Sequence, residues 1–248
     1  MGFFEIFFHP QGWFYLLLLS ILEIILGIDN VIFISIVTDK LKVSALKQRA
    51  RFLGLTLALI FRFVLLAMLS LLIHLIEPIY SPWFGEFNYK DLVLLAGGLF
   101  LVYKSILELQ RGLKHKAELA LENELSFRSV VTQIVLVDIV FSLDSVISAI
   151  GMVNGMQQEL DANPIAIVYL SVLVSMLVML RFSGIISDFI QKNPNIKTIA
   201  LSFLLVIGVF LVAEAFKYPF PKGYIYFGFG FSLFVELLNM RARRNKAQ

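Results

Sequence analysis

The stretch EIILGIDN, residues 23–30, decides how this chain is organised. It lies inside an apolar run from Gly12 to Val37, which is long enough to cross a bilayer because a helix needs about 20 residues to span the hydrocarbon core. Acids inside such a run are costly, since a central Asp disfavours insertion by about 2.5 to 3.5 kcal/mol. A cost of that size points to a functional site at membrane depth.

A second stretch, DIVFSLDS at residues 138–145, repeats the pattern. Four positions match at a constant offset of 115 residues: Glu23 with Asp138, Gly27 with Ser142, Asp29 with Asp144, and Asn30 with Ser145. The same pair of acids at the same spacing in two apolar runs is hard to explain by chance packing. Within the first copy, Gly27 lowers the cost of a bent or unwound turn, so we expect the helix to be interrupted there.

Composition identifies an integral membrane protein. Of the 248 residues, 59% are hydrophobic and 16% are charged, and no hydrophilic stretch is long enough for a separate soluble domain. The absence of cysteine excludes disulfides, iron–sulfur clusters and thiol nucleophiles. Without a phosphate-binding loop or a Ser/His/Asp set at membrane depth, we do not expect an enzyme. The net charge of +3 reflects basic loops beside the spans, so nucleic acid is not an expected partner.

Seven apolar segments predict seven transmembrane helices in one all-α membrane domain, residues 1–248. The predicted spans are 12–37, 52–75, 91–110, 129–153, 164–187, 197–216 and 223–240. Fifteen of the 21 Lys and Arg residues fall on one side of these spans and three on the other. By the positive-inside rule the N-terminus is then outside, and the C-terminus and the connector 111–128 are cytoplasmic.

The first six spans form two related halves. FRF at 61–63 matches LRF at 180–182, and GLFLVYK at 98–104 matches GVFLVAE at 208–214. The predicted parts are repeat A (about 12–110), a cytoplasmic connector (111–128), repeat B (about 129–216) and an extra helix (about 223–240). Because each repeat has three spans, the second enters the membrane inverted. Such 3+3 inverted repeats are typical of secondary transporters, whose substrates bind near mid-bilayer.

The two motifs supply hard oxygen ligands. The candidate metal ligands are Glu23, Asp29, Asn30, Asp138, Asp144 and Ser145. Carboxylate, amide and hydroxyl oxygens suit Mn²⁺, Mg²⁺ or Ca²⁺, and acids that bind either a cation or protons can couple the two. The alternative is that the acids form structural ion pairs with basic residues inside the spans. We expect at least one of Arg62, Lys104 and Arg181 to neutralise excess acid, with Lys104 the first choice.

Taken together, these motifs resemble the TerC family of bacterial membrane proteins, especially its short members without appended CBS domains. The likeness covers nearly the whole chain and includes RARFLGLTLALIFRF at 49–63, GGLFLVYKSILEL at 97–109 and SFLLVIGVFLVAE at 202–214. The resemblance implies a bacterial inner-membrane location and membership of the lysine-exporter superfamily. Because several family members are implicated in manganese export, it also implies Mn²⁺ as the ion held by the six candidate ligands.

We therefore expect a transporter that exports a divalent cation, with Mn²⁺ as first choice and Ca²⁺ or Mg²⁺ as alternatives, in exchange for protons. No tightly bound cofactor is expected. The expected partners are the metal ion and the lipid bilayer, and the sequence is compatible with a homo-oligomer. The rival hypothesis is a non-transporting scaffold in metal-stress or membrane-protein insertion complexes. The acidic motifs distinguish the transporter hypothesis from the scaffold hypothesis, because a scaffold needs no facing carboxylates at mid-membrane.

Overall fold

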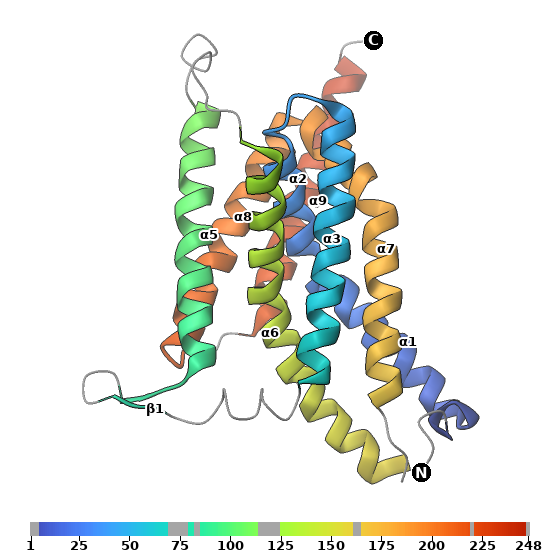
Figure 1. Ribbon diagram of the computed structural model, residues 1–248. Coiled ribbons are helices and arrows are strands. Elements are labelled where there is room, and N and C mark those ends of the chain that lie inside the picture. The colour runs from blue at the N-terminus through green and yellow to red at the C-terminus, as the bar shows by residue number, and fades with distance from the viewer. Residues whose placement is uncertain are drawn as a thin grey trace. The chain divides into compact units, whose positions relative to one another are not determined.

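The chain folds into two compact units, each of which combines segments from both predicted repeats (Figure 1). Unit 1 comprises Met1–Glu77 and Leu125–Ile186, and unit 2 comprises Pro78–Glu124 and Ser187–Gln248. The computed structural model describes residues 5–68, 79–81, 85–113, 125–160, 165–218 and 221–246, with side chains for 6–68, 88–112, 125–143, 165–218 and 221–243.

Unit 1 holds both acidic motifs. Its elements are η1 (Glu5–Phe8), α1 (Pro10–Leu26), α2 (Ile28–Thr38), α3 (Ser44–Ala67), α6 (Phe127–Leu160) and most of α7 (Ile165–Lys192). Helices that correspond in the two predicted repeats run in opposite directions, with α1 and α2 against α6 and α3 against α7 (Figure 1). Opposed directions are what an inverted repeat requires.

The first motif is interrupted at Gly27, as its sequence predicts. Helix α1 ends at Leu26 and α2 begins at Ile28, and Gly27 stands between them with φ −89° and ψ −2°. An added Cβ atom there would lie 2.4 Å from Sδ of Met179 on α7, near the flexible end of that side chain, and 3.0 Å from the backbone oxygen of Glu23. The break places Asp29 in the first turn of α2, where the helix dipole favours a negative charge. In the second motif, by contrast, α6 continues without a break.

Helices α3 and α6 pack along each other, and this contact sets the position of Arg62. At their crossing, Gly54 of α3 leaves room for Ile134 of α6, whose Cγ2 would lie 2.6 Å from an added Cβ. Leu55 and Val130 are fully or almost fully buried in the same region. Two turns beyond Gly54, Arg62 then faces α6 at the level of Asp138, so apolar packing aligns the charged residues.

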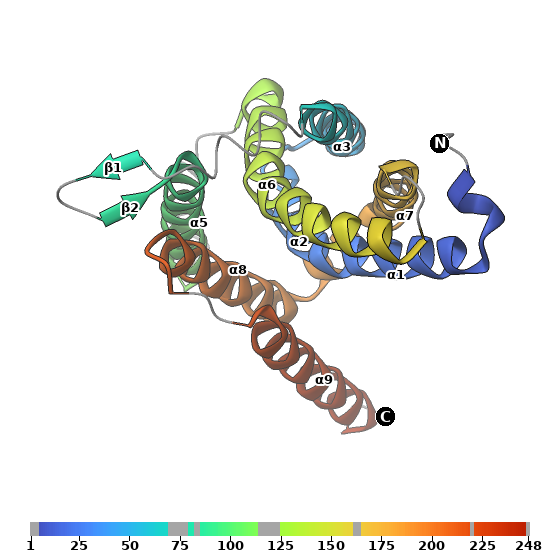
Figure 2. The same ribbon diagram turned by 90° about the horizontal axis from the view of Figure 1, so that it is seen from below.

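Unit 2 is built on a close pair of helices from the two repeats. Its elements are β1 (Ile79–Ser81), β2 (Gly85–Phe87), α5 (Tyr89–Leu113), α8 (Pro194–Ala215) and α9 (Lys222–Lys246). Figure 2 shows α5 and α8 side by side. An added Cβ on Gly98 would lie 2.8 Å from the Gly208 carbonyl oxygen, and one on Gly208 would lie 3.0 Å from the Gly98 carbonyl oxygen. This reciprocal contact joins two positions that the repeat comparison had matched.

The protein is an all-α membrane protein, and within the described part of the chain the exception is one short strand pair, in which β1 pairs with β2 in antiparallel register. Six helical segments among the described residues are long and apolar enough to cross a membrane, and the predicted span 129–153 lies within α6. Large exposed apolar side chains, such as Phe61, Leu136 and Phe227, suit contact with lipid. The strand pair was not predicted, because its segments are too short to show a strand pattern.

Several helices extend past the predicted spans, and the start of α3 differs most. The second span was expected to start at residue 52, but α3 begins at Ser44. Its first two turns carry Lys47, Arg49 and Arg51, so the helix extends past the apolar run that hydropathy detects. Residues 69–75, where this span was expected to end, lie outside the described residues.

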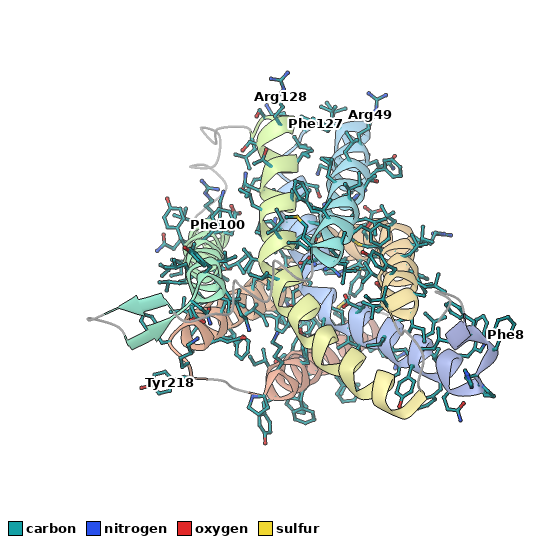
Figure 3. All side chains as sticks on the ribbon, turned by 60° about the horizontal axis from the view of Figure 1, so that its bottom comes forward. Phe8, Arg49, Phe100, Phe127, Arg128 and Tyr218 are labelled. Carbon is teal, nitrogen blue, oxygen red and sulfur yellow. The ribbon has the colours of Figure 1, made fainter. Side chains whose placement is uncertain are left out.

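The starts of α3 and α6, which carry basic residues, lie at the same end of unit 1. Arg49, near the start of α3, and Arg128, near the start of α6, lie at the same end of the unit, whereas Phe8 lies away from them (Figure 3). The described residues of the predicted loops 38–51 and 111–128 that Figure 3 labels, Arg49 and Arg128, therefore lie on one side of this unit, as the positive-inside rule requires.

Candidate functional site

The two acidic motifs meet at Arg62. This arginine, in the second half of α3, donates from Nη1 to Oε2 of Glu23 at 2.8 Å. It also reaches both oxygens of Asp138, with 3.3 Å from Nε to Oδ2 and 3.2 Å from Nη2 to Oδ1. One guanidinium thus bridges a carboxylate from α1 and its repeat partner from α6. The planar fork of arginine suits this double contact, which a lysine could not reproduce.

Two further polar side chains complete the contacts of Asp138. Asn30, at the start of α2, donates from Nδ2 to Oδ1 of Asp138 at 2.7 Å. Ser142 lies one turn after Asp138 on α6, and its Oγ is 2.9 Å from Oδ2 and also bonds to the Asp138 backbone carbonyl. The serine thus satisfies its hydroxyl within its own helix, as expected for this residue at membrane depth.

The site is buried. Arg62, Asp138 and Asn30 are each 2% exposed and Glu23 is 8% exposed. Charges in such surroundings are tolerated only as hydrogen-bonded pairs, because desolvation of an unpaired ion costs several kcal/mol, on the order of the whole stability of a small domain. With two carboxylates and one guanidinium ionised, the group carries one net negative charge. That excess favours a further positive charge.

Some of the predicted ligands come together here and others are not placed. Glu23, Asn30 and Asp138 share the cluster around Arg62. Asp29 is 3% exposed on the adjoining turn of α2. The side chains of Asp144 and Ser145 lie outside those described, so their place in the site stays a prediction. Among the described side chains, no group of three or more Asp, Glu or His residues is arranged to hold a metal ion.

Arg62 is the basic residue that pairs with Glu23 and Asp138, and nothing in the sequence pattern distinguishes it from the other two candidates. Its repeat partner Arg181 is exposed on α7. Our first choice, Lys104, belongs to unit 2, where its Nζ lies 5.8 Å from the centre of the Phe100 ring. Two other acids, near the ends of their predicted spans, also have partners within unit 2. Glu214 accepts from Lys90 at 3.1 Å, and Glu236 accepts from Asn195 at 2.7 Å.

Asn30 has one oxygen atom, Oδ1, that could serve as a further ligand. Its Nδ2 points to Asp138, so its Oδ1 points elsewhere, and this buried oxygen has no hydrogen-bond partner among the described residues. An unused amide oxygen next to two carboxylates fits a hard divalent cation, which takes oxygen ligands from carboxylates, amides and water. Carboxylate and amide oxygens thus lie close together here, while Arg62 holds both oxygens of Asp138 and Oε2 of Glu23 in this arrangement.

Fold and site together define a multi-pass membrane protein of inverted repeats with a buried carboxylate cluster where its two acidic motifs meet. The chain belongs to the integral membrane protein TerC family, which matches residues 8–248. This confirms the resemblance drawn from the sequence motifs.

Several relatives support this assignment. A UPF0053 protein of Haemophilus influenzae is 40% identical over 97% of this chain and 98% of its own length. The UPF0053 inner membrane proteins YgdQ and YoaE of Escherichia coli are 39% and 42% identical over 95% and 97% of the chain. The chain spans 96% of YgdQ but only 45% of YoaE. The family and the apolar helices together identify a multi-pass inner-membrane protein. No solved structure matches the chain.

Proposed function

We propose that this protein exports a divalent metal cation across the inner membrane through the carboxylates of Glu23 and Asp138. One observation carries the proposal: acids from both inverted motifs converge on one buried point, beside an amide oxygen of Asn30 that has no partner among the described residues. Burying two acids at membrane depth is expensive, and ion pathways are where such residues are usually found.

Mn²⁺ is the proposed substrate, with Mg²⁺ and Ca²⁺ as the alternatives to test. Carboxylate and amide oxygens suit all three ions, so the described ligands favour the class of hard cations without choosing within it. The preference for Mn²⁺ comes from the family resemblance. Protons are the proposed exchange partner, because acids that release a cation can take up protons in its place.

The test is transport by the purified full-length chain in proteoliposomes that contain a metal-sensitive dye. We expect Mn²⁺ to enter, and replacement of Asn30 by alanine to slow the entry by roughly tenfold, because one ligand oxygen and the anchor of Asp138 are lost. Asn195→Ala is the matched control, since Asn195 is an amide that also contacts an acid, Glu236, but belongs to unit 2. If no divalent cation enters liposomes that contain correctly folded wild-type protein, the proposal is wrong.

A specific observation also favours the rival function, a non-transporting scaffold. Arg62 already holds Glu23 and Asp138 together, as expected if the acids only tie the helices of unit 1 to one another. A scaffold would remain folded, would show no cation flux in the liposome assay, and would need the ion pairs only for stability. The same experiment therefore separates the two functions.

A further inference from the structure

We propose that Arg62 is a built-in counter-ion that exchanges places with the transported cation. The inference rests on the proposed function, because it states how the same carboxylates alternate between the guanidinium and the metal ion. In this scheme Arg62 is a positioning residue that offsets one of the two carboxylate charges of the ion-free carrier, and a proton taken up in exchange offsets the other. It does not ligate the metal.

The contacts of the two acids make Arg62 and a metal ion mutually exclusive. Both oxygens of Asp138 already have hydrogen-bond partners. Its Oδ1 accepts from Nη2 of Arg62 and Nδ2 of Asn30. Its Oδ2 lies next to Nε of Arg62 and Oγ of Ser142. Oε2 of Glu23 accepts from Nη1 of Arg62. A hard cation would bind these oxygens at about 2.0 to 2.6 Å, directly against the positive hydrogens of the guanidinium. One of the two cations must therefore leave before the other can bind.

Asn30 provides the complementary change. In the present arrangement its Nδ2 donates to Asp138, and its Oδ1 has no hydrogen-bond partner among the described side chains and backbone. When the guanidinium withdraws and a metal ion arrives, rotation of the amide by half a turn would bring Oδ1 to the metal. One side chain then serves both states, as a donor to the carboxylate beside Arg62 and as an oxygen ligand beside the metal ion.

The exchange solves a charge problem for the transport cycle. A carrier that returns without its cation and with a proton on one acid would leave the other acid unpaired in a low-dielectric environment, and uncompensated buried charges are strongly unfavourable. Arg62 supplies the missing positive charge from α3, within the same unit. The long side chain allows the charge to move while its backbone stays in the helix.

The experiment compares two transport modes of the full-length chain in proteoliposomes, with radioactive Mn²⁺ as the probe. Arg62→Gln should lose net uptake into manganese-free vesicles, because the ion-free carrier is no longer neutral. It should keep exchange against internal Mn²⁺, and its apparent affinity should rise by roughly tenfold or more, since the competing internal cation is gone. Arg181→Gln is the matched control: it changes the repeat partner, which is exposed, and should behave like the wild type.

The outcomes distinguish the inference from the function on which it rests. If the wild type moves Mn²⁺ and Arg62→Gln matches it in net uptake and affinity, the counter-ion role is wrong and the transport function stands. If the wild type moves no divalent cation in either mode, the proposed function itself fails. Loss of both modes in Arg62→Gln with normal folding would also overturn the counter-ion role, because exchange should survive.

A stability measurement covers the case in which Arg62→Gln folds poorly. If the metal ion can take the place of the guanidinium, added Mn²⁺ should raise the melting temperature of Arg62→Gln more than that of the wild type. It should also restore the yield of folded variant when present during growth and purification. A variant that stays unfolded with Mn²⁺ present would overturn the proposal, because the ion would then be unable to replace the missing charge.

Discussion

At the scale of single residues, the two carboxylates that contact Arg62 are not equivalent. Asp138 accepts from two nitrogens of Arg62 and from Asn30, and also lies within hydrogen-bond distance of Ser142, whereas Glu23 accepts one bond from Arg62. Asp138 is also the more deeply buried of the two. The stability of unit 1 should therefore depend more on the charge of Asp138 than on that of Glu23.

This difference predicts an order of stabilities. Asp138→Asn should lower the melting temperature of the purified protein more than Glu23→Gln, because hydrogen bonds to a charged group contribute about 1.5 to 3 kcal/mol each and more of them are weakened. Thermal unfolding in detergent, followed by circular dichroism, measures the order. Asp39→Asn is a control, since Asp39 pairs with Lys47 at a partly exposed site. Equal losses for the two buried variants would contradict the unequal roles.

The remaining acids of the motifs give a second prediction at this scale. Asp29→Asn and Asp144→Asn should abolish Mn²⁺ transport and leave the protein inserted, because asparagine keeps the size and one oxygen but removes the charge that draws a divalent ion from water. Insertion should not suffer, since a neutral amide costs the membrane no more than a carboxylate. Transport in proteoliposomes is measured beside protein abundance. Normal transport by both variants would exclude these two acids from the ion site.

At the scale of helices, the close approach of α5 and α8 depends on two glycines. Gly98→Ala or Gly208→Ala would place a methyl group about 3 Å or less from the carbonyl of the facing helix, which is backbone and cannot rotate away. We expect each variant to lose about 1 to 3 kcal/mol of stability, as is usual for overpacked contacts. Gly112→Ala is the matched control on α5, because an added Cβ there meets no atom within 4 Å. Thermal unfolding of the three variants tests the contact.

Much of this arrangement could be predicted from the sequence, because its strongest signals are local and repeated. The interruption at Gly27 follows from a glycine between two acids in an apolar run, and the match of Gly98 with Gly208 follows from the repeat. The choice between Arg62 and Arg181 could not be predicted. Both follow the same pattern, and only the packing of α3 against α6 turns one of them inward. A sequence repeat shows which positions are equivalent, but it does not show at which of these positions the two copies differ in their contacts.

At the scale of the whole molecule, the repeats are distributed over both compact units. Unit 1 combines the first two spans of each repeat and contains the acidic motifs, whereas unit 2 combines α5 and α8, the third span of each, with the extra helix α9. Corresponding helices therefore lie in the same unit and run in opposite directions (Figure 1). The ion site we propose needs only unit 1, because Glu23, Arg62 and Asp138 all belong to it.

The last prediction concerns the orientation of the chain in the membrane. We expect the N-terminus outside and the connector 111–128 in the cytoplasm, because 15 basic residues lie on that side and three on the other. The structure of unit 1 agrees with the prediction that basic residues from separate loops share one side, since Arg49 and Arg128 lie at the same end of the unit (Figure 3). The chain has no cysteine, so single cysteines can be introduced and labelled without a background signal.

Ser126→Cys should be protected from a membrane-impermeant thiol reagent in intact spheroplasts and should react after lysis, because it lies directly before α6 on the predicted cytoplasmic side. Gln11→Cys, at the start of α1, should react in intact spheroplasts. The two variants control for protein abundance and reagent quality, since one cysteine reports the cytoplasmic side of the membrane and the other reports the outside. Labelling of Ser126→Cys and protection of Gln11→Cys in intact spheroplasts would invert the topology. In that case the basic loops would face outward, against the charge asymmetry that predicts them inside.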